Sequence, residues 1–534
     1  MATGGARPDV NLDAVVRWVD ETETGDRADL DDVPDDALVW RDVTSSSDTR
    51  VGGKCRFYEE CFVTKMKRRA EAAHIVVTNH HLYCADLALR STGFGAQVLP
   101  DYDAVIFDEA HALEDVATEF FGVRITRGRV DAVVRDALRS FEIAGLLMDA
   151  SRSSTIGRTL STLSAAAQVL FAGLPRGRGD GTGGGGGRVM LAQGAFAGSL
   201  GQAMDVLVHS LDELHTMVRD FVDQNEALLG VARRIRSLRQ AIDTVTDHES
   251  PTHVVFAESD ARGGGALGAS PVEIGPMLAD HLWSRRGAVI LTSATLSTAG
   301  EKGFGFVRKR LGVPDEARDV LLESPFDFPS QAALYIPRKL PEPRDDAYLM
   351  LAVDEIRSLV EITSGGAFVL CTSHRQMRAF AAELRGAWTY PTFVQGDAPK
   401  QSLLTRFRES GDGVLFATSS FWEGVDVPGR ALRLVIMDKL PFDAPNDPVV
   451  AARIQRLIEQ GREPFAEFQL PAAALALKQG FGRLIRSRRD AGIVAILDRR
   501  LLTRNYGRQL LAALPPASRC ASLEELRAFW QSVE

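Results

Sequence analysis

The stretch Asp103-Ala-Val-Ile-Phe-Asp-Glu-Ala-His111 decides how the rest of this sequence is interpreted. Its four apolar residues, 104–107, form the short run that is typical of a buried parallel strand. The run ends in two carboxylates, Asp108 and Glu109. Ligands of open α/β sheets bind beyond the carboxyl ends of the strands, so we expect both acids to face a binding site. An acidic first turn of a helix is the alternative, because Asp and Glu suit a helix N-terminus.

Two adjacent acids at the end of a strand have a specific use in phosphate chemistry. Mg²⁺ takes one or two carboxylates together with phosphate oxygens. The second acid can orient the water that attacks a terminal phosphate. The pair therefore predicts a nucleotide site, provided that further phosphate-binding residues follow along the chain.

The composition is that of a globular protein with several domains. A length of 534 residues suggests roughly three or four domains. A net charge of -9 argues against a generally basic nucleic-acid-binding protein, although it allows a local basic channel. No apolar run reaches the roughly 20 residues that cross a bilayer, and the start lacks the apolar core of a signal peptide. Five cysteines make no disulfide framework, so we expect a cytoplasmic protein with no membrane partner.

The first 70 residues combine an acidic segment with two cysteines. Residues 12–39 are rich in Asp and Glu, which predicts a solvated surface segment. Cys55 and Cys61 follow with a loop-like spacing. A metal or iron–sulfur site requires four ligands, and the next cysteine, Cys84, lies in an apolar stretch. The spacing alone therefore favours two thiols that bind no metal.

A second apolar run, residues 75–77, precedes Asn79-His80-His81. It lies close enough to residues 104–107 for the two runs to be strands of one sheet with a helix between them. The histidine pair is interpreted as a capping or packing feature rather than a metal site.

Residues 126–245 have a helical character that sets them apart. Apolar side chains recur there at helical spacing: Met204, Leu207, Val208, Leu211, Leu214, Val218, Phe221 and Val222. We expect a helix-rich insertion in which this stripe forms the core. Five consecutive glycines, 183–187, interrupt it. A phosphate cradle would need a strand before the glycines and a helix after them, so the run predicts a flexible, disordered loop.

The second half of the sequence predicts a second parallel sheet. The first sheet resumes at the apolar run of residues 288–291, and Thr292-Ser293-Ala294-Thr295 follows it with hydroxyls suited to bind water or neighbouring acids. From near Gly305 onward, helical patterns alternate with strand-like runs at residues 367–370, 414–417, 434–437 and 493–497. That alternation is typical of βαβ units.

A glutamine and two arginines stand close together near the end of the chain. Gln479, Arg483 and Arg486 are spaced by four and three residues on a predicted helix, so we expect their side chains to share one face. Two guanidiniums and an amide suit recognition of a triphosphate from across a cleft, and such an arginine can contribute about 10³–10⁵ in rate. A basic helix face paired with surface acids is the alternative.

Four motifs occur in one order: D-E-A-H at 108–111, S-A-T at 293–295, W-E-G-x-D at 422–426 and Q-x-x-G-R-x-I-R at 479–486. Together they resemble the superfamily 2 DNA helicases of the DinG/XPD type, over nearly the whole chain from about Val16. The resemblance implies two RecA-like domains, the first interrupted by an iron–sulfur domain and a helical arch. It also implies a motor that moves 5′ to 3′ on single-stranded DNA using ATP.

The resemblance gives an α/β fold with expected boundaries. Residues 1–70 would be a remnant of the iron–sulfur domain and 126–252 the arch-like helical insertion. Residues 71–125 and 253–300 would form an incomplete first RecA-like domain. Residues 301–534 would be the second RecA-like domain.

The resemblance also implies roles for individual residues. Asp108 would hold Mg²⁺, Glu109 would activate water, and His111, Ser293 and Thr295 would couple the nucleotide state to the DNA path. Gln479, Arg483 and Arg486 would reach the phosphates of ATP, with Arg486 as the arginine finger. The implied contacts to the DNA backbone are Ser373, His374, Arg375, Thr418 and Ser419. The implied residues of the nucleotide cleft are His111, Glu423, Gly424 and Asp426.

Two departures from the family pattern shape the expectation for this chain. No G-x-x-x-x-G-K-[ST] loop occurs, and the only Gly-Lys step, Gly53-Lys54, is followed by Cys55. We therefore expect a truncated or split chain whose ATP cradle comes from a separate polypeptide carrying the Walker A segment. Arg50 stands where the family pattern has a cysteine, so Cys55 and Cys61 would leave the iron–sulfur site incomplete.

Two other interpretations remain open. One is a nucleotide-independent DNA-binding or scaffold protein that kept the fold and lost the motor. The other is a non-functional truncation that folds poorly, because missing strands would leave an open sheet edge and an exposed apolar face.

Overall fold

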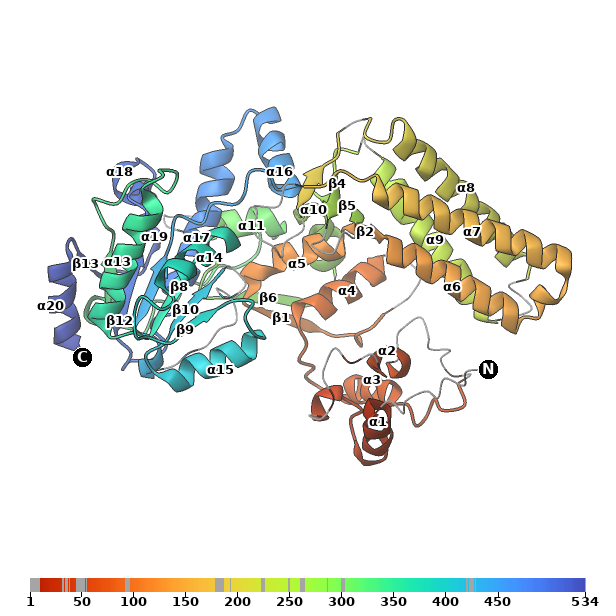
Figure 1. Cartoon of the computed structure of the whole chain (residues 1–534), viewed down its shortest axis with the longest axis horizontal. Helices are drawn as coiled ribbons and strands as arrows, with labels where there is room; N and C mark the ends of the chain where they lie inside the picture. The colour runs from red at the N-terminus through yellow and green to blue at the C-terminus, as the bar shows by residue number, and fades with distance from the viewer. Residues whose placement is uncertain are drawn as a thin grey trace. The chain divides into compact units, whose positions relative to one another are not determined.

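The computed structural model in Figure 1 divides into two compact units: Met1–Val105 with Arg286–Ala288, and Ile106–Arg285 with Val289–Glu534. Each unit has its own buried side chains. The structure describes residues 10–30, 33, 37, 39–44, 53, 55–91, 97–177, 187–192, 194–221, 226–247, 250–259, 265–285, 287–298, 303–418, 421, 427 and 429–533.

The first unit contains short helices around small apolar clusters. Its helices are α1 (Val10–Glu21), η1 (Arg27–Asp29), α2 (Val39–Val43), α3 (Phe62–Ala72) and α4 (His80–Ser91). Trp18 and Trp40 pack edge to face beside buried Val15. In α4, the buried carboxylate of Asp86 accepts a hydrogen bond from Arg90 and from the N–H groups of residues 98 and 99. Asp86 therefore fixes the segment that leads into the first strand.

The strand expected at residues 75–77 is not formed. These residues lie between α3 and α4 without regular structure, and the side chains of Ile75 and Val77 are exposed. A strand needs a partner to bond its backbone groups, and none of the described residues supplies one here. The histidine pair lies in the first turn of α4, where Asn79 Oδ1 accepts the N–H of Leu82 at 2.8 Å. Asn79 rather than the histidines makes this contact, so the capping or packing role of the histidine pair stays a prediction.

Strands β1 (Ala104–Asp108) and β6 (Ala288–Thr292) form a two-stranded sheet, as the two apolar runs predict. The Ala288 N–H donates to the carbonyl of Asp103 at 3.0 Å. Phe107 is buried, but Ile106 is 66% exposed. Two strands alone make a marginal sheet. Among the described residues this sheet therefore buries only part of its apolar surface.

Helix α5 (Leu113–Phe120) leads into the insertion expected over residues 126–252. Four long helices of the described chain pack on one core: α6 (Arg127–Ile143), α7 (Ala150–Ala172), α8 (Ser199–Arg219) and α9 (Glu226–Thr246). The predicted stripe in α8 is confirmed, because Met204, Leu207, Leu211, Leu214 and Val218 are buried. Of the five glycines, only Gly187 belongs to the described residues.

An antiparallel sheet that the sequence did not predict packs against these helices. Its strands are β2 (Val123–Thr126), β3 (Arg188–Met190), β4 (His253–Ser259) and β5 (Gly265–Pro271), in the order β2-β5-β4-β3. Strand β5 is rich in small residues and lacks the β-branched alternation that marks a strand. Gly268 stands opposite Phe256, and a Cβ on Gly268 would lie 2.4 Å from that ring. The glycine is therefore needed to make room for the aromatic side chain.

Short elements connect this region to the last part of the chain. They are α10 (Gly275–Leu278), η6 (Ala279–Trp283), α11 (Gly305–Leu311) and α12 (Phe328–Gln331). The predicted second parallel sheet then follows. Its order is β13-β7-β12-β11-β8-β10-β9, and each adjacent pair is parallel. The four predicted strands are β8 (Ala367–Leu370), β10 (Val414–Ala417), β11 (Leu434–Met437) and β12 (Gly492–Ile496). The sequence did not predict β7 (Ala332–Tyr335), β9 (Thr392–Val394) and β13 (Ser518–Cys520).

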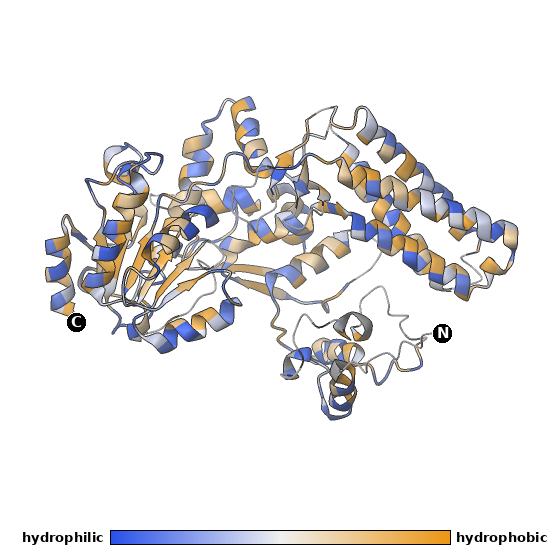
Figure 2. Ribbon diagram, in the orientation of Figure 1, coloured by the Kyte–Doolittle hydropathy of each residue, from blue (hydrophilic) through white to orange (hydrophobic). Residues whose placement is uncertain are grey.

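Helices cover both faces of this sheet (Figures 1 and 2). On one face pack α13 (Tyr348–Thr363), α14 (His374–Leu384) and α20 (Leu523–Val533). On the other pack α15 (Lys400–Ser410), α17 (Leu470–Phe481) and α19 (Gly507–Ala513). Alternate residues of one strand enter opposite cores: Phe368 one and Val369 the other. Burial on both faces explains why these strands are continuous apolar runs in the sequence.

The remaining described helices are α16 (Pro448–Glu459), α18 (Arg500–Thr503) and the short turns η3 (Ala110–Ala112), η4 (Leu146–Met148), η8 (Gly429–Ala431) and η9 (Phe465–Gln469). No helix in the described ranges combines the length and the apolarity that a bilayer span needs.

Candidate functional site

The two acids of the first motif stand where the sequence predicts them. Asp108 is the last residue of β1, and Glu109 follows it with φ 50°, in the left-handed region. A non-glycine residue in that region is uncommon, and such strain concentrates at functional sites. Both side chains are exposed. The acids therefore lie at an accessible strand end, as the sequence analysis expects.

A polar cluster joins this strand end to the end of β6. Ser293 donates its hydroxyl hydrogen bond to Glu109 Oε2 at 2.9 Å. The Nδ1 atom of His111 lies 2.9 Å from Ser293 Oγ and 3.1 Å from Thr295 Oγ1. Thr295 also donates its N–H to Ser293 Oγ at 3.1 Å. The structure thus brings together all three residues predicted to couple the nucleotide state, and adds Glu109 to them.

The carboxylate of Asp108 fits a hard cation. It is exposed at the strand end, and no hydrogen bond or ion pair engages it among the described residues. Mg²⁺ prefers carboxylate and phosphate oxygens and keeps several waters. Asp108 would hold the ion from one side only, which leaves positions for the oxygens of a phosphate.

The prediction that Gln479, Arg483 and Arg486 share one helical face is wrong. Helix α17 ends at Phe481, so only Gln479 lies on it. Arg483 is in the following turn, and Arg486 lies beyond that turn. Glycines at 480 and 482 weaken the helix at this point. Burial of the side chains that follow, at 484 and 485, turns the chain back into the core. Arg483 is buried, whereas Arg486 is exposed.

The predicted DNA contacts follow strands of the C-terminal sheet. Ser373 caps α14, because its Oγ accepts the N–H of Gln376 at 3.2 Å. Thr418 is buried and donates its N–H and its hydroxyl to Gln395 Oε1, at 2.7 and 2.9 Å. His374 and Arg375 are exposed in the first turn of α14. Because their side chains are exposed, His374 and Arg375 are the better candidates for DNA contacts. The hydroxyls of Ser373 and Thr418 instead bond to groups of the protein itself.

Other residues that the sequence analysis singled out lie outside the described residues. They are Arg50, Lys54, Ser419, Glu423, Gly424 and Asp426. Cys55 and Cys61 are half-buried and take part in no disulfide. The incomplete iron–sulfur site and the roles of residues 423–426 stay predictions.

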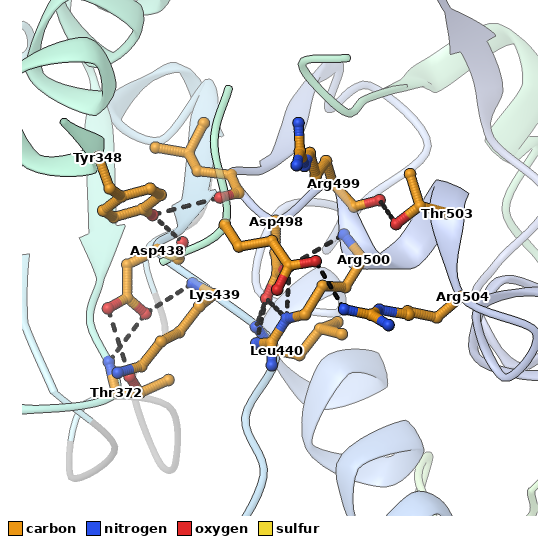
Figure 3. A network of polar contacts seen from close by, with 12 residues as sticks. Tyr348, Thr372, Asp438, Lys439, Leu440, Asp498, Arg499, Arg500, Thr503 and Arg504 are labelled. Carbon is orange, nitrogen blue, oxygen red and sulfur yellow. Dashed lines mark hydrogen bonds and ion pairs between the residues drawn. The ribbon is translucent and has the colours of Figure 1, made fainter. Parts of the chain in front are cut away.

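Two buried aspartates that the sequence analysis missed organise the carboxyl edge of the C-terminal sheet (Figure 3). Asp438 follows β11 and is 1% exposed. Its carboxylate accepts the N–H groups of Thr372 and Lys439, at 3.0 and 2.8 Å, and the hydroxyl of Thr372 at 3.3 Å. Asp438 thereby ties the end of β8 to the end of β11.

Asp498 repeats this arrangement after β12. It is 0% exposed and accepts the N–H of Leu440 at 3.0 Å, together with the Nε of Arg500. Tyr348 donates to the carbonyl of Asp438, and its hydroxyl lies 3.2 Å from the carbonyl of Leu497. Asp108 was predicted as a site residue because it follows an apolar run. Asp438 and Asp498 also follow apolar runs, so the same pattern could have identified them.

The parallel strands place the predicted functions at opposite edges of this sheet. Thr372 and Thr418 follow β8 and β10, so they lie at the carboxyl edge. Arg486 precedes β12, and its N–H donates to Asp490, two residues before that strand. The backbone of Arg486 therefore lies at the amino edge. The sheet separates the predicted DNA contacts from the predicted arginine finger.

A buried ion triad joins three helices. Glu114 in α5 pairs with Arg310 in α11, whose Nε lies 2.9 Å from Glu114 Oε2, and with Arg453 in α16 at 2.9 Å. Arg453 also donates its Nε to the carbonyl of Val272 at 2.9 Å. Burial raises the pKa of Glu114, but the two arginines outweigh it, so this pKa lies below its ordinary value. The triad therefore holds α16 against the helix that follows the D-E-A-H motif.

A second contact joins the segment after β6 to helix α17. Lys478, beside Gln479 in α17, donates to Ser297 Oγ at 3.4 Å, two residues beyond Thr295. Burial lowers the pKa of Lys478. The segment that carries S-A-T thus contacts the helix that carries Gln479.

Known proteins resemble this chain over most of its length. The Helicase C-terminal domain model matches residues 356–517. The ATP-dependent DNA helicase YoaA of Haemophilus influenzae is 34% identical over 98% of this chain and 79% of its own length. The chain belongs to the DinG/YoaA family of ATP-dependent DNA helicases.

Further matches support the same family and fold. The ATP-dependent helicase DinG of Mycobacterium tuberculosis is 29% identical over 97% of this chain and 75% of its own length. The solved structure of Xpd4 from S. tokodaii superposes with a TM-score of 0.51 at 16% identity, covering 82% of this chain and 81% of that one. The predicted DinG/XPD-type family and the α/β fold are confirmed. The exact domain boundaries stay predictions.

The ion triad gives a prediction about stability. Replacing Glu114 with Gln leaves two buried arginines without their counter-charge, which we expect to cost about 3–5 kcal/mol. Because the pKa of Glu114 is lowered in the folded chain, its contribution is present at neutral pH and is lost as the pH falls. Thermal melting of E114Q and of the parent, followed from neutral to acid pH, measures both effects. The matched control is E119Q, an exposed site on the same helix; equal melting of E114Q and E119Q would contradict this account.

The buried Asp438 gives a prediction about pH. Burial raises the pKa of its carboxyl to about 7, above the ordinary 3.8. Between these values the folded chain holds a proton that the unfolded chain releases, so stability falls as the pH rises through this window. D438N removes the titration, and we expect the parent to lose about 2 kcal/mol relative to D438N between about pH 5 and about pH 8. Denaturation with urea at each pH tests this, with D412N as the exposed control. Parallel profiles for the parent and D438N would contradict the raised pKa of Asp438.

Proposed function

We propose that this chain couples ATP hydrolysis to translocation along single-stranded DNA and to duplex unwinding. The cluster of Glu109, Ser293 and His111 is the observation that carries the proposal. It links the acid that would activate water to the segment after β6, and that segment in turn contacts α17. A change at the nucleotide therefore has a continuous set of contacts through which to act.

Each acid has a distinct part in the proposed reaction. Asp108 would hold Mg²⁺, which neutralises charge on the phosphates when bound. Glu109 receives the Ser293 hydrogen bond on Oε2. Its other oxygen is left to accept a hydrogen bond from the attacking water, which orients that water toward the terminal phosphate.

Three residues of the last motif stabilise the negative charge that develops on the phosphates during hydrolysis. Gln479, Arg483 and Arg486 would reach the phosphates, with the exposed Arg486 as the finger. The 534 residues contain no G-x-x-x-x-G-K-[ST] loop. Amide groups and a lysine are needed to cradle the β- and γ-phosphates. We therefore propose that a phosphate-loop segment outside these 534 residues completes the ATP site.

Mutation of the two key residues tests the proposal. The chain is assayed for ATP hydrolysis with single-stranded DNA and a separately supplied phosphate-loop segment. We expect E109Q and R486A each to lower the rate by about 10³-fold or more, because water activation and charge stabilisation are lost. R489A, three residues away in the same exposed turn, is the matched control and should keep the parent rate. Parent-like activity in E109Q and R486A would refute the assigned roles.

The exposed His374 and Arg375 after β8 also fit a second candidate, a nucleotide-independent DNA-binding protein. In that case single-stranded DNA affinity would fall with salt but would not respond to ATP or to E109Q. Under the motor proposal, with the phosphate-loop segment present, we expect ATP to shift the affinity of the parent. Fluorescence anisotropy of a labelled oligonucleotide separates the two functions, and an unresponsive parent would favour the second.

A further inference from the structure

A buried carboxylate lies inside the exposed turn that carries Arg486. Asp490 Oδ2 accepts the N–H groups of Arg486 and Ser487, at 2.7 and 2.6 Å. Its Oδ1 accepts the Ser487 hydroxyl at 2.9 Å. Asp490 is only 9% exposed, whereas residues 486–489 are exposed. One buried side chain thus holds three donors of a turn that is otherwise at the surface.

The turn is also held on its carbonyl side. Gln331, the buried last residue of α12, donates its Nε2 to the carbonyl oxygens of Ser487 and Asp490, at 3.0 and 2.7 Å. Its Oε1 accepts the N–H of Asp327 at 3.0 Å. Gln331 directly precedes β7, and Ala332 of β7 pairs with Gly492 of β12. The turn is therefore fixed to the amino edge of two adjacent strands.

This arrangement exceeds what a surface turn needs. Hydrogen bonds to a charged acceptor are stronger than bonds between neutral groups. The Asp490 carboxylate accepts two of its three from the backbone N–H groups of Arg486 and Ser487. Arginine has a long side chain with many rotamers. Its guanidinium can be aimed reproducibly only when the backbone that carries it does not move.

We propose that Asp490 is a positioning residue for Arg486, which fixes the backbone from which this guanidinium reaches the phosphates of ATP. The inference rests on the proposed function and extends it to a residue outside the four motifs. Asp490 touches no substrate. It acts through Arg486, with Ser487 and Gln331 as its supports.

The proposal predicts a specific kinetic signature. A misplacement of about 1 Å at a reacting group can cost about 10²-fold in rate. We expect D490N to lower kcat for DNA-stimulated ATP hydrolysis by about 10- to 100-fold, with KM for ATP changed less than about threefold. S487A removes one of the three bonds and should lower kcat by a smaller factor. It keeps the proposal falsifiable if D490N folds poorly.

A matched control separates positioning from general stability. Asp447 caps α16 by accepting two backbone N–H groups, from Val449 and Val450. D447N therefore removes the same kind of charge-assisted contact at a helix with no assigned motif. We expect D447N to lower the melting temperature and to leave kcat unchanged.

A double-mutant cycle decides whether Asp490 acts through Arg486. All variants are assayed as the full chain with the phosphate-loop segment. In the R486A background, D490N should cause no further loss of kcat, because the group that it positions is gone. Multiplicative losses, or a D490N rate equal to that of D447N, would overturn the inference while leaving the role of Arg486 intact. A parent-like rate for R486A itself would refute the proposed function, and this inference with it.

Discussion

The C-terminal sheet depends on hydrogen-bond partners for the polar backbone groups at the two ends of its buried strands. Strands β8, β10, β11 and β12 have no exposed residue, so the chain that enters or leaves them must bond its N–H groups to protein. Carboxylates do this at both edges. Asp438 and Asp498 bind the segments that leave the strands, and Asp490 binds the turn before β12. Buried acids therefore determine the shape of the loops that the proposed motor uses.

The two edges also separate two kinds of chemistry. The segment after β8 presents His374 and Arg375, whereas the turn before β12 presents Arg486. A rigid sheet with cores on both faces transmits a displacement of one edge to the other with little distortion. The contact of Lys478 with Ser297 is one point at which such a displacement would reach the S-A-T segment.

The sequence predicted those features whose cause is local. A strand buried on both faces is a continuous apolar run, so residues 434–437 could be recognised without a partner. Residues 104–107 and 288–291 have the same apolar pattern, although Ile106 and Ile290 are exposed among the described residues. The cluster at Glu109 followed from the family resemblance. The strand predicted at residues 75–77 does not form, because this run has the same apolar pattern but no neighbouring strand among the described residues. The end of α17 at Phe481 was missed because burial of the following residues, rather than spacing, determines it.

Other features depend on contacts between residues that are far apart in the sequence. Strand β5 has no strand-like pattern, since its Gly268 makes room for a ring on β4. Glu114 is an ordinary acid in an amphipathic helix until Arg310, 196 residues later, packs against it. Asp490 gave no local signal for its three bonds. Pairing of this kind becomes visible only when the fold has brought the partners together.

The triad of Glu114, Arg310 and Arg453 has a thermal consequence. The hydration of charged groups becomes less favourable on heating, so the cost of keeping these ions out of water falls as the temperature rises. Apolar contacts gain no comparable advantage. The joint between α5 and α16 should thus retain its strength in warm conditions better than the apolar clusters around it, and heating should loosen the helical insertion before it separates these two helices.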